Sequence, residues 1–285
     1  MYLSYNKNDV ESLCGFKSKK FTMPNYLMSC LLAVVFTCAF YGLLLPFYGK
    51  GVDYIDMWFH GGIKNRSSIP YYTVFLTCWS LAILLIKHLK LKNQRKAFKL
   101  DILPADVNFV LSPRTAKEIL DRIYLQVDQP RRYVLLDRID LALGNLKNIG
   151  NVDAVSECMN SQASDDEAYL ESSYTILKGF IWAIPVLGFI GTVIGLASAV
   201  GGFGNVVAQG AEIEELKTAL GGVTSGLSIA FETTLIALVL ALIVQLLAKF
   251  IQSQEEQFLD ECAVYCNRNI VAKMKKASLS SDEVF

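Results

Sequence analysis

The sequence predicts an all-α membrane protein with four transmembrane helices, a helical cytoplasmic insert and long helices that extend into the cytoplasm. Of its 285 residues, 53% are hydrophobic and only 19% are charged, a balance that is unusual for a soluble domain. The apolar residues gather in four blocks, each as long as the roughly 20 residues that a helix needs to cross the hydrocarbon. Between the blocks, apolar residues recur at helical spacing.

The four apolar blocks define the predicted spans. The first covers residues 26–48 and the second residues 71–89. The third lies within residues 179–211 and the fourth within residues 218–248. Polar, lysine-containing sequence precedes the first block, and that block is longer than the apolar core of a typical signal peptide. We therefore expect it to be a retained anchor.

Lysine and arginine predict the orientation, because they are enriched in cytoplasmic loops. Nine of them lie before the first block or around the end of the second: Lys17, Lys19, Lys20, Lys87, Lys90, Lys92, Arg95, Lys96 and Lys99. The loop 49–70 carries three, Lys50, Lys64 and Arg66, which weaken this signal but do not reverse it. Both termini are thus expected in the cytoplasm. The predicted regions are a cytoplasmic N-terminal segment (1–25), spans one and two with a short periplasmic loop (26–89), the insert (90–172), spans three and four (173–250) and a cytoplasmic helical tail (251–285).

The insert is predicted to be helical. Ser112 followed by Pro113 is typical of a helix start, since proline suits the first helical position. Apolar residues then recur at helical spacing, among them Leu135, Ile139, Ala142 and Leu146. Residues 145–151 predict a break. The segment SDDE at 164–167 predicts a capping box at a new helix start, and we expect that helix to run without interruption into the third span.

The fourth helix is predicted to continue beyond Lys249 with an apolar stripe for packing, made of Leu259, Cys262, Cys266 and Ile270. Cys262 and Cys266 share one helix face, but without a second ligand pair helix packing is favoured over metal binding. The seven cysteines are scattered and odd in number, unlike a secreted disulfide framework. We predict no metal and no cofactor.

Small residues give the third span one flat face. Gly188, Thr192 and Gly195 recur at helical spacing, and Gly191 directly precedes Thr192. Such faces let membrane helices approach closely, so helix packing explains the glycines better than it explains the threonine. Pro185 removes a backbone hydrogen bond and is predicted to kink the helix.

The fourth span carries the most informative residue. Glu232 is the only charged side chain in residues 218–248. A carboxylate inside a membrane helix is costly, so it usually faces a partner or a water-filled path. Thr224 and Ser228 stack on the face of Glu232 at four-residue spacing, with Thr233 at its flank. We interpret this polar stripe as part of an ion path. The alternative is a protonated Glu232 that is hydrogen-bonded to a neighbouring helix.

The segments WAIPVLGFIGTVIGL (182–196) and ALGGVTSGLSIAFETT (219–234) resemble the MotA/TolQ/ExbB proton-channel family, over residues 182–249. The four-span layout is closer to the flagellar stator subunit than to the three-span ExbB or TolQ. The resemblance implies an ion channel or motor subunit of the bacterial inner membrane, not an enzyme. It also implies a ring of five copies around two copies of a single-span partner similar to MotB, ExbD or TolR, whose membrane aspartate carries H⁺ or Na⁺.

The resemblance also implies roles for individual residues. Thr192 matches the pore threonine of the family. The family register of the fourth span puts the second pore hydroxyl at Val223, and Thr224 and Ser228 are the nearest hydroxyls. In the same register Glu232 stands where ExbB has a proline, so the chain departs from the family pattern there.

Two other functions stay open. One is a specialised motor similar to the ZorA subunit of anti-phage systems, although the tail after Lys249 is shorter here. The other is a non-conducting membrane scaffold whose polar face only binds a partner helix. No GxxxxGK[ST] or HExxH motif supports an enzyme. Acidic and basic residues are equal in number, 27 of each, so no net charge favours nucleic acid.

Overall fold

The computed structural model is all-helical in the residues that it describes, which are 2–48, 58, 68–100, 102, 111–149, 152–210 and 212–274. Four of its helices are long and apolar enough to cross a membrane, which confirms the predicted fold class. The chain divides into two units, which we treat separately. The polar unit comprises Met1–Met28, Leu85–Tyr174 and Phe250–Phe285, and the apolar unit comprises Ser29–Leu84 and Thr175–Lys249.

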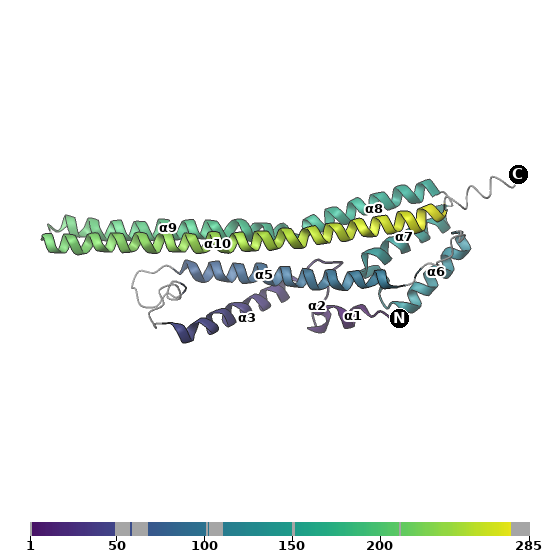
Figure 1. Cartoon of the computed structure of the whole chain (residues 1–285), viewed down its shortest axis with the longest axis horizontal. Coiled ribbons are helices and arrows are strands. Elements are labelled where there is room, and N and C mark those ends of the chain that lie inside the picture. The colour runs from purple at the N-terminus through teal and green to yellow at the C-terminus, as the bar shows by residue number, and fades with distance from the viewer. Residues whose placement is uncertain are drawn as a thin grey trace. The chain divides into compact units, whose positions relative to one another are not determined.

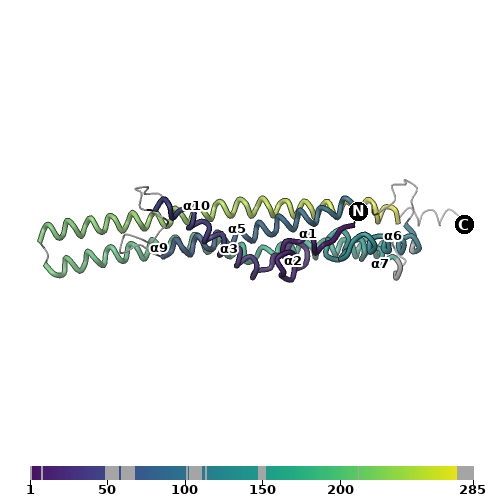
Figure 2. The backbone as a smooth tube through the Cα atoms, turned by 90° about the horizontal axis from the view of Figure 1, so that it is seen from below, coloured from purple at the N-terminus to yellow at the C-terminus, as the bar shows by residue number. Residues whose placement is uncertain are grey.

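Four helices supply the apolar unit, and each overlaps one predicted span. They are α3 (Tyr26–Leu44), which η1 (Leu45–Phe47) extends, α5 (Ile69–Gln94), α9 (Thr175–Ala208) and α10 (Ile213–Cys266). Within this unit α9 and α10 run side by side as a hairpin (Figures 1 and 2). Gly210 lies in the turn with φ of +68°, a left-handed conformation that glycine adopts without strain.

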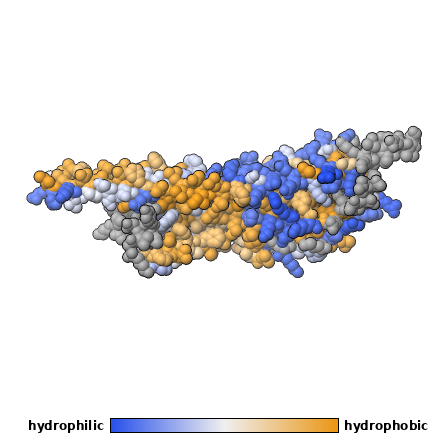
Figure 3. All heavy atoms as spheres, viewed as in Figure 1, coloured by the Kyte–Doolittle hydropathy of each residue, from blue (hydrophilic) through white to orange (hydrophobic). Residues whose placement is uncertain are grey.

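The apolar unit buries few side chains and exposes many hydrophobic ones. Ile184 of α9 packs with Ala237 and Ala241 of α10 in a small core. Outside that core Phe189 and Leu246 are 65% and 63% exposed, and hydrophobic side chains cover much of the visible surface of this unit (Figure 3). An apolar outer surface of this extent suits contact with lipid.

The polar unit contains the shorter helices. It is built from α1 (Tyr5–Asn8), α2 (Val10–Leu13), η2 (Arg95–Lys99), α6 (Pro113–Gln126), η3 (Pro130–Arg132), α7 (Val134–Ile149), α8 (Val152–Ser173), the ends of α5 and α10, and the π-helical η4 (Asn267–Val271). Helix α6 begins at Pro113 as predicted, and a capping box between Ser112 and Thr115 closes its first turn. The apolar stripes predicted for α7 and for the end of α10 are both buried.

Among the described residues of the polar unit, three buried ion pairs join its helices. They are Lys87–Glu255 at 3.2 Å, Lys90–Glu11 at 2.7 Å and Arg138–Asp166 at 2.7 Å, each with both side chains at most 3% exposed. Because a buried charge is stable only when it is paired and hydrogen-bonded, these contacts fix which helices lie together.

One prediction about the insert is wrong, and two are imprecise. Helix α8 begins at Val152, so the segment 164–167 lies in mid-helix and caps nothing; Asp166 instead pairs with Arg138. The predicted run into the third span is interrupted only at Tyr174: α8 ends at Ser173, α9 begins at Thr175, and Val152–Ala208 together form one candidate span. Between them the Tyr174 amide donates to the Glu171 carbonyl at 3.1 Å, a three-residue bond. The predicted break at 145–151 is shorter, since α7 continues to Ile149.

Candidate ion-path site

Glycines bring the backbones of α9 and α10 into close contact. A Cβ atom added at Gly188 would lie 2.6 Å from the Cβ of Ala237, and one added at Gly226 would lie 2.6 Å from the Cβ of Ala199. Real Cβ atoms do not approach so closely, so any side chain at either position would push the helices apart. Gly191 and Gly195 lie in the same contact, against Thr233 and Ala230 respectively.

Two neighbouring threonines of α10 belong to this helix contact. Thr233 is buried at 7% exposure, and its Oγ1 donates to the carbonyl of Ala230 at 2.8 Å. Thr234 crosses to the other helix, where its Oγ1 donates to the carbonyl of Gly188 at 2.9 Å. The structure therefore places Thr233 against α9, apart from the polar stripe with which sequence reasoning had grouped it. Sequence reasoning missed the interhelical bond of Thr234, although its three-residue spacing from Ala237 offered a signal.

The polar stripe of α10 points away from α9. Ser228 Oγ donates to Glu232 Oε1 at 3.5 Å, and Thr224 Oγ1 donates to the carbonyl of Leu220 at 3.0 Å. Ser228 and Glu232 each stand two residues from Ala230, which is about 200° around the helix axis. Because Ala230 faces α9, the stripe lies on the far side of α10.

Thr192 is not brought together with the stripe. It follows Gly191 at the edge of the α9–α10 contact, is half-buried, and donates from Oγ1 to the carbonyl of Phe189 at 2.6 Å. Pro185 lies inside α9 and is also half-buried. Within one copy of the chain, then, Thr192 and Glu232 occupy different sides of the helix pair.

A hollow between α9 and α10 contains hydroxyls that sequence reasoning missed. Ser198 and Ser225 line a space of about 190 Å³ together with small residues such as Gly195 and Gly222. The rows of small residues on both helices were the available signal, since they leave room beside each serine. In the part of the chain that the structure describes, no group of three or more His, Cys, Asp or Glu side chains lies close enough to hold a metal ion.

A comparison with protein families decides the class of this helix hairpin. Residues 126–263 match the MotA/TolQ/ExbB proton channel family. This chain carries a MotA/TolQ/ExbB family domain. The family consists of channels and not of enzymes, and the family domain holds the last two of the four candidate spans. No curated protein and no solved structure matches the chain.

The extent of the MotA/TolQ/ExbB domain adds to the resemblance seen in residues 182–249. The match begins at the end of α6 and includes α7 and α8, so it takes in much of the polar unit as well as the hairpin. All of the residues assigned to the ion path and to helix packing lie inside it. Membership in this family implies a partner of the MotB, ExbD or TolR type.

Proposed function

We propose that the chain is the ion-conducting subunit of a stator-type motor. Five copies form a ring around two copies of a single-span partner of the MotB, ExbD or TolR type, and the complex couples H⁺ or Na⁺ motive force to mechanical work. The observation that carries this proposal is the position of Glu232, which lies in a MotA/TolQ/ExbB family domain on a face of α10 that turns away from α9.

The outward direction of the stripe supports conduction by an assembly. A carboxylate inside a membrane-spanning helix usually faces a partner or a water-filled path, and Glu232 lies on the face of α10 that turns away from α9. Thr224 and Ser228 extend the same face with hydroxyls that can solvate a passing cation. Thr192 stands on another side of the helix pair, so one copy alone does not bring it to the polar stripe. In a ring, the side that carries Thr192 would face the partner or the next copy. Thr233 contributes indirectly by holding the hairpin beside the path.

The distribution of basic residues supports a location in the bacterial inner membrane with both termini in the cytoplasm. Residues 1–25, 90–172 and 251–285 are then cytoplasmic, and the four spans occupy residues 26–89 and 173–250. The polar unit would lie in water and the apolar unit in lipid, in agreement with their different surfaces.

Ion flux through the purified complex tests the proposal. The chain and its single-span partner are reconstituted in liposomes, and acidification of the lumen is followed with a pH-sensitive dye under an imposed potential, with Na⁺ as the alternative ion. We expect Glu232→Gln and Thr192→Val each to lower the flux by about tenfold or more, which corresponds to about 1.4 kcal/mol in the barrier.

Two control variants make the same kinds of replacement at residues outside the proposed ion path. Glu214→Gln alters an exposed carboxylate at the start of α10, and Thr218→Val removes a hydroxyl that bonds only its own helix. Both controls should conduct normally. Normal flux in both test variants would refute the ion-path role, and a stable wild-type complex without flux would identify a non-conducting scaffold.

A further inference from the structure

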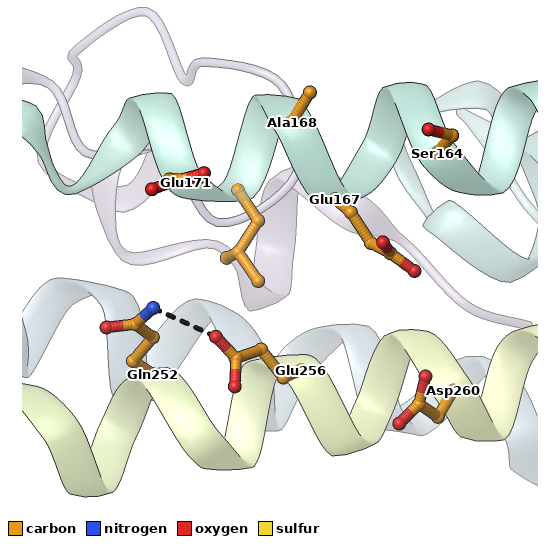
Figure 4. A pocket seen from close by; sticks show the side chains of 8 residues that line it. Ser164, Glu167, Ala168, Glu171, Gln252, Glu256 and Asp260 are labelled. Atoms are coloured by element: carbon orange, nitrogen blue, oxygen red, sulfur yellow. Dashed lines mark hydrogen bonds between the residues drawn. The ribbon is translucent and has the colours of Figure 1, made fainter.

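An acidic groove runs between α8 and α10 in the polar unit (Figure 4). It has a volume of about 490 Å³, and its walls carry Glu167 and Glu171 from α8 and Glu256 and Asp260 from α10. All four side chains are exposed. Within the groove Gln252 Nε2 donates to Glu256 Oε1 at 2.9 Å, and none of the described residues that line the groove is a lysine or an arginine. Four carboxylates that face one space repel one another, so the groove favours a cationic occupant.

A basic ridge occupies the exposed side of the end of α5 and of η2. It consists of Lys92, Arg95 and Lys99, which are exposed, whereas Lys87 and Lys90 of the same helix are buried in ion pairs. Among the described residues, no member of the ridge has an ion-pair partner. Three exposed cations thus lie on this side of the unit, and the structure pairs none of them with a carboxylate of the described residues.

Most of the groove lies on the side of α10 away from the ridge, and Asp260 stands between the two, since it lines both the groove and the hollow beside Phe98. Phe98, between Arg95 and Lys99, packs edge-on against Phe258 and Tyr265 of α10 with ring centroids 5.8 and 5.9 Å apart. Glu256 stands two residues from Phe258, or about 200° around the helix. In Figure 1 α8 and the end of α5 flank this part of α10 on opposite sides.

The two surfaces also lie at the same level along α10. The contacts of Phe98 reach from Phe258 to Tyr265, and the groove extends along α10 to Asp260. A unit that presents opposite charges on opposite sides at one level is complementary to a second copy placed beside it. Repetition of such a head-to-tail contact closes into a ring when the rotation between copies permits.

A second copy of the chain fits these two surfaces better than a lipid surface does. A lipid surface would contact only the ridge, whereas a second copy satisfies both surfaces, because one copy offers the carboxylates of the groove and the next offers the lysines and the arginine of the ridge.

We propose that the acidic groove between α8 and α10 of one copy receives the basic ridge of Lys92, Arg95 and Lys99 of the next copy. This contact would be the cytoplasmic seam of the ring, so the inference rests on the proposed function. The seam fixes how neighbouring copies are oriented. The groove of one copy attracts the ridge of the next, whereas two grooves or two ridges repel each other.

Zero-length cross-linking tests the seam, because a carbodiimide joins a lysine to a carboxylate only where the two touch. Membranes that contain the full-length chain and its partner are treated and resolved on a denaturing gel. We expect a ladder of covalent multimers up to five copies, with linked peptides that join Lys92 or Lys99 to the carboxylates of the groove. The double variant Lys92→Gln/Lys99→Gln should lose most of the ladder, and Lys117→Gln, which removes an exposed lysine of α6, should keep it.

Charge reversal provides a second measurement. Glu256→Lys/Asp260→Lys should abolish the ladder, and combination with Lys92→Glu/Lys99→Glu should restore it, since the pairs are re-formed with exchanged signs. A ladder that is unaffected by these changes, or a wild-type complex of five copies that forms no such links, overturns the seam and leaves the proposed motor intact. A wild-type chain that native mass spectrometry shows as a monomer, and that conducts no ions, refutes the proposed function and the seam with it.

Discussion

The two units are made of the same kind of helix but are held together by different forces. The polar unit buries ion pairs such as Lys87–Glu255 and also large side chains such as Tyr133 and Phe258. In the apolar unit, glycine and alanine allow backbone contact and a threonine bonds across the helices. The hydrophobic effect works only against water, so it drives the polar unit, whereas close packing and hydrogen bonds must hold helices that are surrounded by lipid.

The largest effect is expected from breaking a buried ion pair in the polar unit. Lys87→Met leaves Glu255 buried without its cation, although Tyr174 still donates to this carboxylate at 2.6 Å. An uncompensated buried charge costs about 3–5 kcal/mol. The loss should appear as a lower midpoint in urea unfolding of the detergent-solubilised protein, followed by circular dichroism.

A control variant and a rescue variant distinguish the effect of the unpaired buried charge from the effect of replacing a lysine side chain. Lys117→Met on the exposed face of α6 should leave the midpoint in place. The double variant Lys87→Met/Glu255→Leu removes both charges and should recover most of the stability, because an apolar pair can replace a buried ion pair. If Lys87→Met unfolds like the control, the buried pair is not what holds this unit.

A smaller effect is expected from widening the helix contact in the apolar unit. Gly188→Ala places a methyl group 2.6 Å from the Cβ of Ala237 and 3.2 Å from the Cα of Thr234, and neither atom can rotate away. Overpacking of this kind costs about 1–3 kcal/mol. Thermal unfolding in detergent gives the measurement. Gly179→Ala is the matched control, since nothing lies within 4 Å of its added methyl; equal stability of the two variants would contradict close packing at Gly188.

The smallest effect is expected from the bond across the hairpin. Thr234→Val keeps the shape and removes the donor to the Gly188 carbonyl, which should cost about 0.6 kcal/mol, the average for such bonds between membrane helices. Thr224→Val removes a hydroxyl that bonds only its own helix and should cost less. The same unfolding assay compares them, and a larger loss at Thr224 would show that the stripe, not the contact with α9, stabilises α10.

The sequence predicted the helices well because their signals are local. Apolar length marked the spans, and the Ser112–Pro113 start of α6 is chemistry within one turn. The prediction for residues 164–167 failed because a serine followed by acidic residues can occur both at a helix start and in the middle of a helix. The contact of Asp166 with Arg138, 28 residues away, shows that the segment lies in mid-helix, and local sequence does not reveal that contact. The same limit applies to the site. Sequence spacing placed Thr233 with Glu232 in the polar stripe, and only the position of α9 shows that Thr233 belongs to the helix contact instead.

The division of α10 into a face that contacts α9 and a face that carries the polar stripe has an evolutionary consequence. The glycines and alanines that set the fold of the hairpin are separate from Thr224, Ser228 and Glu232. A lineage can therefore exchange hydroxyls and acids on the stripe, and with them the ion or the partner, without rebuilding the hairpin. Selection can act on coupling chemistry and on folding as two nearly independent traits carried by one helix.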